Sequence, residues 1–312
     1  MKAETASLSI EKAGLHCSIQ DLGRRGWLHL GVSVGGVADE HAARWANALV
    51  ANSADSPVLQ LCMANFKLRA HSDCVVAVCG AEYDIKAGGR NEQNWSRFNL
   101  AAGEQLSLSP ARSGLYSYVA FAGGLQKLAP SLGSYAMNER EGLGHKQGKA
   151  LTKGDLLFIQ RKQQRQSRSS VHPSAQARYD TALALRFIPN FDWQQLNPAQ
   201  QQEFLQSEWR IGAQSNQMGL RLEGQKLELA QRPRLSAPLS PGCIQLPPEG
   251  QPIVLMKQHQ SIGGYPLLGC VYRCDLEALG QRRPGQKLHF KLGNIEMAQA
   301  SYQRWLGQWN PN

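Results

Sequence analysis

Short apolar runs, each too brief for a buried helix, recur through the first half of the chain and limit the folds that it can adopt. Ser72 to Gly80, Gly103 to Leu108, Leu115 to Phe121 and Asp155 to Ile159 are runs of this kind. They are rich in apolar or strand-forming residues and are separated by Gly, Pro, Asn or Asp. Many short strands at this spacing favour an antiparallel barrel or sandwich. The sequence therefore predicts a mostly β (α+β) fold.

The second half of the chain continues the strand pattern. Leu183 to Pro189, Leu220 to Leu222 and Leu227 to Leu229 are predicted strands. Gln286 to Leu292 alternates between polar and apolar residues and is expected to be an edge strand.

Three segments have helical periodicity instead. Apolar residues recur every three or four positions from Ala42 to Val50, and Asp39 stands where a carboxylate favours a helix N-terminus. Asn197-Pro198 predicts a capped start of a helix that runs to about Trp209. From Asn294 onward, apolar residues again follow helical spacing, so we expect a C-terminal helix packed on the body.

The length of 312 residues is sufficient for two domains, each with its own core. A polar segment from Gln160 to Arg178 holds five cations and no acid, which is typical of a solvated linker. We therefore expect an N-terminal domain over residues 1–162, a mobile basic linker or loop over 163–178, and a C-terminal domain with a terminal helix over 179–312.

The formal net charge of +10 would suit a nucleic-acid ligand, but half of the excess lies in this one segment, which has no interleaved aromatic residues. Nucleic acid is therefore not expected as a partner. No window approaches the ~20 apolar residues of a membrane span, and the N-terminus lacks the core of a signal peptide. Seven cysteines without a CxxC pair indicate core residues in a reducing cytoplasm, with no bound metal.

A polar turn between two apolar runs is the first candidate for a ligand site. The runs are Ile253 to Met256 and Leu267 to Tyr272, and the turn between them contains Gly263 and Gly264, for which we expect positive φ. Gln260, Ser261 and Tyr265 would offer donors and acceptors at one strand end, and His259 is the one histidine placed to take part. An ordinary glycine hairpin with surface amides is the alternative.

Two further loops carry groups that could hold an anion. Gln20-Asp21 is followed by Arg24, which could place a carboxylate against a guanidinium, and Gly35-Gly36 precedes the Asp39 helix and could present backbone N–H groups. The alternative is that Asp21 and Arg24 form a purely structural pair, and that Gly35-Gly36 only allows the chain to enter the helix that follows. The sequence contains no recognisable nucleophilic triad, Walker loop or metal signature.

The run from Pro241 to Leu255, followed by Gly263-Gly264-Tyr265-Pro266, resembles the C-terminal signature of a known family. The family is that of biotin-dependent carboxyltransferase-like proteins, also called the allophanate hydrolase subunit 2 family. Further segments resemble the family's motifs in the family's order: Ile19 to Arg24, Gly31 to Asp39, Ala120 to Leu125, Leu132 to Ser134, Gly142 to Gly144 and Gln214 to Leu222. The resemblance runs from about Gly14 to Gln286.

The resemblance implies two cyclophilin-like β-barrel domains and a role as the C subunit of 5-oxoprolinase. Such a protein would work with a subunit-B-like partner (allophanate hydrolase subunit 1) and with the A subunit to open 5-oxoproline to glutamate, with ATP bound through the complex. The alternatives are a carboxyltransferase module of urea-carboxylase type, which would use biotin, and a non-enzymatic regulatory binding protein. No catalytic residue is assigned. The substrate or nucleotide is expected at Gln20, Asp21, Arg24, Gly35, Gly36, Asp39, Ser134, Arg221, Gln245, Gln260, Ser261, Gly263, Gly264 and Tyr265.

The chain departs from the family pattern at five acidic positions, where it has amides. They are Gln60, Asn138, Gln147, Asn216 and Gln258, and Gln217 replaces an arginine. An amide cannot act as a general base or take a carboxylate's place at a metal. The substitutions therefore predict weak turnover, a different substrate or a supporting role.

Overall fold

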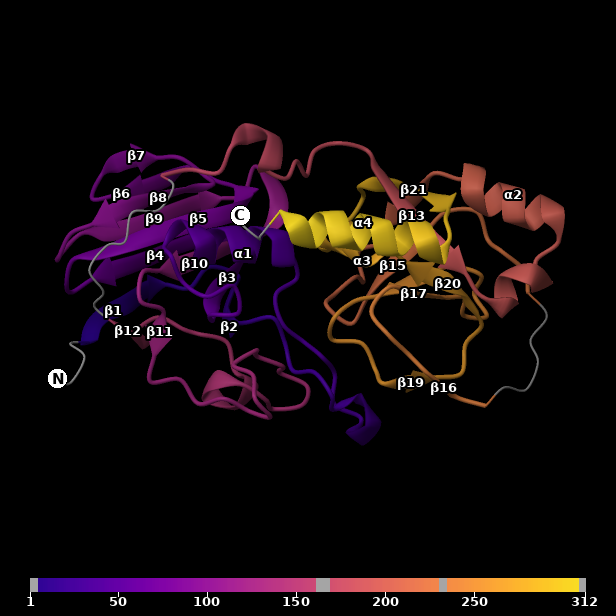
Figure 1. Cartoon of the computed structure of the whole chain (residues 1–312), viewed down its shortest axis with the longest axis horizontal. Helices are drawn as coiled ribbons and strands as arrows, with labels where there is room; N and C mark the ends of the chain where they lie inside the picture. The colour runs from indigo at the N-terminus through magenta and orange to yellow at the C-terminus, as the bar shows by residue number, and fades with distance from the viewer. Residues whose placement is uncertain (1–4, 161–168, 230–234, 309–312) are drawn as a thin grey trace. The chain divides into compact units, whose positions relative to one another are not determined.

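The computed structural model describes residues 5–160, 169–229 and 235–308. The chain forms two units: residues 1–24 with 35–180, and residues 25–34 with 181–312 (Figure 1). The second unit thus takes a short N-terminal segment that includes the 3₁₀ helix η1 (Leu28–Leu30).

The first unit consists of two sheets that enclose one core. The seven-stranded sheet has the order β11 (Leu125–Gln126), β12 (Leu156–Gln160), β1 (Thr5–Lys12), β4 (Ala64–Ala70), β9 (Gln105–Pro110), β6 (Ile85–Ala87), β7 (Arg90–Glu92). The five-stranded sheet has the order β2 (His16–Gln20), β3 (Val58–Cys62), β10 (Ser113–Phe121), β5 (Cys74–Glu82), β8 (Ser96–Leu100). Along β4, buried residues alternate with more exposed ones, so one face of the strand lines the core.

Helix α1 (Glu40–Leu49) packs on β5 and β10 of the five-stranded sheet. Asp39 is its N-cap, because Asp39 Oδ1 accepts a hydrogen bond of 3.0 Å from the backbone N–H of Ala42. The predicted helix is confirmed, and Asp39 lies at its N-terminus as expected. A second 3₁₀ segment, η2 (His145–Gly148), follows in the loop before β12.

The second unit is built round a closed barrel. Its order is β13 (Leu183–Pro189), β20 (Leu267–Val271), β17 (Cys243–Gln245), β18 (Ile253–Leu255), β15 (Gly219–Glu223), β14 (Trp209–Ile211), β21 (Lys287–Leu292). The prediction that β21 is an edge strand is wrong, since β21 pairs in parallel with β13 and antiparallel with β14 and so closes the barrel. Residues 227–229 are not a strand.

Helices and a short ribbon surround the barrel. Helix α2 (Pro198–Gln206) begins at the predicted cap, where Asn197 and Gln200 form a capping box, and α4 (Ile295–Gly307) begins after the Asn294 cap. Helix α3 (Arg273–Gly280) was not predicted, because no side chain caps it. The two-stranded ribbon pairs β16 (Ala237–Pro238) with β19 (Ile262–Gly263), and η4 (Phe191–Gln195) precedes α2. No described helix is long and apolar enough to cross a membrane.

The segment expected to be a linker lies partly outside the described residues, since 161–168 are not described. Its described part packs on the first unit instead of extending into solvent. Arg97 N donates to the Ser169 carbonyl at 2.9 Å, and Val171 N donates to the Trp95 carbonyl at 2.8 Å. After η3 (Pro173–Ala175), the first unit continues to residue 180.

Candidate functional site

The residues predicted for the site fall into two groups, one in each unit. Seven lie in the first unit: Gln20, Asp21, Arg24, Gly35, Gly36, Asp39 and Ser134. The other seven lie in the second unit: Arg221, Gln245, Gln260, Ser261, Gly263, Gly264 and Tyr265. Each group has its own set of buried donors and acceptors.

In the first unit, Asp21 joins the loop after β2 to the loop around Ser134. Asp21 Oδ1 accepts hydrogen bonds from the Ser134 hydroxyl at 2.6 Å and from the backbone N–H of Gly23 at 2.8 Å, and Oδ2 accepts one from the backbone N–H of Tyr135 at 2.7 Å. Asp21 is 7% exposed and Ser134 is 1% exposed. A buried carboxylate with three donors is well satisfied, so Asp21 holds the two loops together.

Arg24 lies in the same cluster and is 2% exposed. Its Nη2 donates to the carbonyl oxygen of Ala136, and its Nε lies 3.5 Å from the carbonyl oxygen of Ser131. Nη1 is buried and has no hydrogen-bond partner among the described residues. Burial lowers the pKa of Arg24, while the charges of Asp21 and Glu141 act in the opposite direction. Because a guanidinium stays charged at neutral pH, Nη1 is a fixed cationic donor with hydrogen-bonding capacity to spare.

Gly35 leaves room for the Arg24 side chain, and Gly36 leaves room for the backbone just before it. Gly35 and Gly36 have φ of +63° and +91°, a region that favours glycine. A Cβ on Gly35 would lie 3.2 Å from Arg24 Nη1, and a Cβ on Gly36 would lie 2.8 Å from the backbone nitrogen of Gly23. Any side chain at Gly35 would therefore crowd the unpaired guanidinium nitrogen.

Gln20 and Asp39 are tied into the structure as well. Gln20 Nε2 donates to Ser18 Oγ and to the carbonyl oxygen of Met137, both at 3.2 Å, while Gln20 Oε1 is buried without a partner among the described residues. Asp39 caps α1 with one carboxylate oxygen, and the other accepts a 2.6 Å hydrogen bond from the Tyr179 hydroxyl. Both oxygens of Asp39 thus have structural partners.

The first-unit cluster can hold an oxygen anion. A guanidinium in a fixed, largely water-free position stabilises negative charge more strongly than one in solvent. The carbonyl oxygens of Ser131 and Ala136, which orient this guanidinium, were not predicted. Backbone acceptors leave no mark in the residue types, so only the Leu132-Gly133-Ser134 motif pointed to this loop.

In the second unit, three of the predicted residues, Gln245, Gln260 and Gly263, lie against one another. Arg221 on β15 lies opposite Ile253 on β18 in the strand register. Ile253 also lies opposite Gln245 on β17, and Gln245 lies opposite Leu267 on β20. Arg221 is exposed, whereas Gln245 is 1% exposed. Gln260 Nε2 lies 3.5 Å from Gln245 Oε1, and Gln245 Nε2 is buried without a hydrogen-bond partner among the described residues. Gln245 therefore keeps one buried amide donor beside the turn.

The glycines of the turn play a different part from the one expected. Neither Gly263 nor Gly264 has positive φ, so the expectation of left-handed backbone there is wrong. Gly263 is needed for close approach, because a Cβ on it would lie 2.7 Å from Gln245 Nε2 and 2.8 Å from Leu239 Cδ1. Gly264 has open space, with Ser236 Oγ as its nearest neighbour at 3.9 Å.

Other polar residues of the turn differ in exposure. Tyr265 is 46% exposed and Ser261 is half-buried, so both are accessible. His259 is fully buried, and its Nδ1 lies 2.6 Å from the carbonyl oxygen of Gln260, which requires a proton on Nδ1. A histidine held in this way supports the backbone of the turn and does not reach a ligand.

Two of the residues that depart from the family pattern bond to each other. Gln258 Nε2 donates to Gln217 Oε1 at 2.6 Å, and the backbone N–H of Gln258 donates to the Gln217 carbonyl at 2.9 Å. The family resemblance implies an acid at position 258 and an arginine at position 217. A neutral, hydrogen-bonded amide pair therefore occupies the place where the resemblance implies an opposite-charge pair.

Three other amides supply acceptors that the fold needs. Asn216 Oδ1 accepts from the backbone N–H of Met218 at 2.8 Å, and Asn138 Oδ1 accepts from that of Glu141 at 3.1 Å. Gln60 Oε1, fully buried, accepts from the backbone N–H of Ala38 at 2.8 Å and from the Tyr118 hydroxyl at 3.1 Å. An amide oxygen serves these donors as a carboxylate oxygen would.

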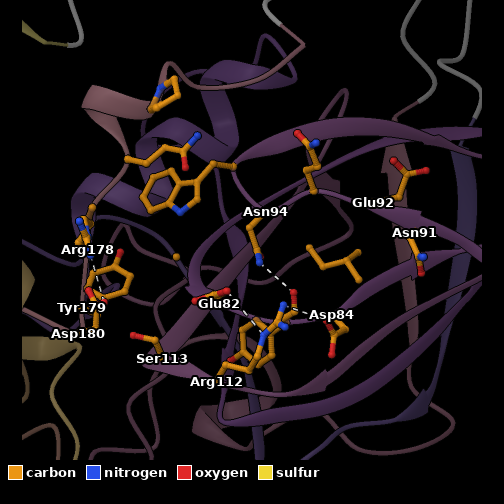
Figure 2. Close-up of a pocket in the computed structure, with 18 of the residues that line it drawn as sticks. Glu82, Asp84, Asn91, Glu92, Asn94, Arg112, Ser113, Arg178, Tyr179 and Asp180 are labelled. Carbon is orange, nitrogen blue, oxygen red and sulfur yellow. Dashed lines mark hydrogen bonds and ion pairs between the residues drawn. The ribbon is translucent and has the colours of Figure 1, made fainter.

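A cavity of about 970 Å³ opens elsewhere in the first unit, and none of the predicted site residues lines it. Figure 2 shows Arg178, Tyr179 and Asp180 on one side of the cavity, with Asn91 and Glu92 on the opposite side. Five of its charged groups form ion pairs within the lining: Arg112 lies 3.6 Å from Glu82 and 2.9 Å from Asp84, and Arg178 lies 3.3 Å from Asp180. The described residues contain no cluster of three or more potential metal ligands.

Comparison with known proteins identifies the class. The model of the carboxyltransferase domain, subdomain A and B, matches residues 30–292, so the chain belongs to this family. It is 34% identical to the 5-oxoprolinase C subunit of Escherichia coli over 93% of both chains, and 32% identical to that of Haemophilus influenzae over 90% of this chain and 89% of the relative. A urea amidolyase of Saccharomyces cerevisiae is 24% identical over 92% of this chain but only 17% of its own length.

Two solved structures share the fold. The protein TTHA0988 is 30% identical with a TM-score of 0.82, and the match covers 92% of this chain but 55% of that one. The Kluyveromyces lactis urea amidolyase has a TM-score of 0.87 at 22% identity over 100% of this chain and 20% of its own. The latter likeness shows the fold alone, and the chain spans only part of both solved proteins.

Proposed function

We propose that this protein is the C subunit of an ATP-dependent 5-oxoprolinase that opens 5-oxoproline to glutamate. The observation that carries the proposal is the 34% identity to the Escherichia coli 5-oxoprolinase C subunit over 93% of both chains. A match over nearly the full length of both proteins includes the loops of Arg24 and Gln245 as well as the cores.

The geometry supports a role in holding charge. Opening an unstrained lactam requires that the amide oxygen be held while negative charge develops on it. Arg24, with its buried and unpaired Nη1, is the group best placed in the first unit for this task. The buried Nε2 of Gln245 is the corresponding neutral donor in the second unit.

Four of the five amides at family acid positions have hydrogen-bond partners within the fold and are compatible with turnover. Gln258 bonds to Gln217, and Asn216, Asn138 and Gln60 accept hydrogen bonds from the chain itself. Positions used in this way serve the fold, so losing their negative charge need not remove the reaction. We therefore propose that these acids are not the catalytic ones.

We further propose that ATP and the remaining catalytic groups come from partner proteins in the cytoplasm. The seven cysteines are free, which fits a reducing compartment. The described residues of this chain offer donors but no evident general base with a free carboxylate in the cluster around Arg24. A subunit-B-like protein and the A subunit of the same enzyme are the proposed partners.

The test is ATP-dependent conversion of 5-oxoproline to glutamate by this chain together with the A and B subunits. Arg24→Lys keeps the charge but removes the planar fork, so we expect kcat/KM to fall by about tenfold or more. The matched control is Arg25→Lys at the exposed neighbouring arginine, which should leave the rate unchanged. Equal rates for wild type and Arg24→Lys would move the site away from this cluster.

A second candidate function is a carboxyltransferase of urea-carboxylase type, favoured by the likeness to urea amidolyase over most of this chain. That activity would need biotin, carried by another protein. Avidin, which captures biotin, separates the two proposals: inhibition of the reconstituted reaction by avidin would favour the carboxyltransferase, and insensitivity favours the oxoprolinase.

A further inference from the structure

Two cysteines of the second unit face each other across neighbouring antiparallel strands. Cys243 on β17 is the register partner of Cys270 on β20. The backbone N–H of Val271 donates to the carbonyl of Gly242 at 2.8 Å, one residue beyond the pair on each strand. This bond pattern makes the two cysteines a non-hydrogen-bonded pair, in which Cα atoms are about 4.5 Å apart and side chains are closest.

The two thiols also share one hydroxyl. Ser240 Oγ lies 3.4 Å from Cys243 Sγ and 4.0 Å from Cys270 Sγ. Cys243 is 8% exposed and Cys270 is half-buried, so the pair lies near the surface and not in the barrel core. A Cα separation of about 4.5 Å lies within the range of about 4.4–6.8 Å that disulfides span.

The surroundings make the thiols unequal. Hydrogen bonds from Cys270 and Ser240 lower the pKa of Cys243 to about 6, against the effect of burial, and the pKa of Cys270 is raised by its bond to Cys243 and by burial. The other members of the cluster that packs on Cys243 are the apolar Leu239 and Leu255. By contrast, burial raises the pKa of Cys274 to about 11.

We propose that Cys243 and Cys270 form an oxidation site that a hydroperoxide converts to a disulfide. The Cys243 thiolate attacks the peroxide, so that an S–O bond forms, the O–O bond breaks and an alcohol leaves after taking a proton. Cys270 sulfur then attacks Cys243 sulfur; the S–S bond forms, the S–O bond breaks, and hydroxide leaves as water with the Cys270 proton. The two thiols are oxidised by two electrons, and one hydroperoxide is reduced to an alcohol and water.

The site adjoins the predicted binding turn but does not depend on the proposed function. Gln245 is two residues from Cys243 on β17 and points to the same face, since Ile244 between them belongs to the barrel core. A disulfide would fix β17 to β20 directly beside Gln245. The oxidation chemistry can be measured whether or not the chain serves an oxoprolinase.

The test is to expose the reduced, full-length protein to a small excess of tert-butyl hydroperoxide, alkylate the remaining thiols and map the peptides. We expect a single link between Cys243 and Cys270, with the loss of two hydrogens. In the Cys270→Ser variant, oxidation should stop at the sulfenic acid on Cys243, because no second thiol is present to attack it. Dimedone traps this sulfenic acid. Cys243→Ser should lower the rate of thiol loss by about tenfold or more.

Cys274→Ser is the matched control, because Cys274 is a half-buried cysteine outside the pair, and it should leave the link unchanged. The peptide map of the wild type requires no variant and so does not depend on the folding of any substitution. Recovery of both Cys243 and Cys270 as free thiols while other cysteines are oxidised would overturn the proposal. Formation of the link only in unfolded protein would overturn it equally.

Discussion

At the scale of single residues, glycines in polar loops serve two distinct physical needs. Gly35 and Gly36 supply backbone with positive φ next to Arg24, whereas Gly263 supplies space for the side chain of Gln245. Both loops contain a pair of glycines, so the sequence does not reveal which pair needs positive φ and which glycine makes space for a side chain. The contact between Gly263 and Gln245 joins residues that are far apart along the chain. The same holds for the amide pair of Gln217 and Gln258.

The two glycines of the turn should therefore respond differently to alanine. Gly263→Ala places a methyl group against Gln245 and Leu239 and should lower the free energy of unfolding by about 1–3 kcal/mol. Gly264→Ala meets open space at ordinary φ and should be neutral or stabilise by about 0.4–1 kcal/mol. Urea denaturation of both variants measures the difference. A larger loss for Gly264→Ala would contradict the assignment.

At the scale of elements, Asp39 connects helix α1 to the segment that ends the first unit. One carboxylate oxygen caps the helix, and the other accepts from Tyr179, which is 4% exposed. Burial and the neighbouring Asp39 raise the pKa of Tyr179, so its hydroxyl keeps its proton. Tyr179 directly follows the basic segment, so this contact attaches the C-terminal end of that segment to the first unit.

Tyr179→Phe removes the hydroxyl that donates to Asp39. Because the acceptor is a buried carboxylate, the free energy of unfolding should fall by about 1.5–3 kcal/mol. Tyr265→Phe is the control, because Tyr265 is 46% exposed. This substitution should change the free energy of unfolding by less than about 0.5 kcal/mol. Thermal or urea unfolding of both variants measures the two losses of stability. If Tyr179→Phe lost as little stability as Tyr265→Phe, the contact with Asp39 would not hold this segment.

The paired strands β17 and β20 give a pH dependence to stability. The pKa of Cys243 is about 6 in the folded protein and about 8.5 in an unfolded chain. A lowered pKa stabilises the fold where the thiolate is present, so the contribution is complete above about pH 8.5 and is lost as pH falls through 6. The stability difference between reduced wild type and Cys243→Ser should grow from pH 6 to pH 8.5 in urea titrations. A constant difference over this range would contradict the lowered pKa.

Capped helices were the elements that the sequence predicted best. Asp39 and Asn197 have side chains that bond to the first turn, and their helices begin where the caps indicate. Helix α3 follows Tyr272, which provides no side-chain cap, and β21 alternates as an edge strand does although it closes the barrel. Local chemistry marks a helix start, but strand neighbours depend on contacts distant in sequence.

At the scale of the whole molecule, the division of the chain does not follow its composition. The first unit extends to residue 180, beyond the basic segment, and the second takes residues 25–34 from the N-terminal part. Composition marks where a chain is polar, whereas membership of a unit is set by packing. The mostly β class was predictable, because strand periodicity is local, whereas the barrel of the second unit was expected only from the family resemblance.

Association with a second protein is the final prediction. The chain covers 93% of the Escherichia coli relative, which is named as one component of an enzyme, but 55% of the solved TTHA0988 chain, so similar units occur both alone and within longer chains. We expect this chain and a subunit-B-like protein, when co-expressed, to elute together in size exclusion at micromolar concentration. The net charge of +10 favours unspecific binding to acidic proteins, so the run needs about 0.5 M salt, at which charges beyond a few ångströms are screened. An unrelated acidic protein of similar size is the control and should elute apart from the chain. Separate elution of the subunit-B-like protein under these conditions would contradict the proposed complex.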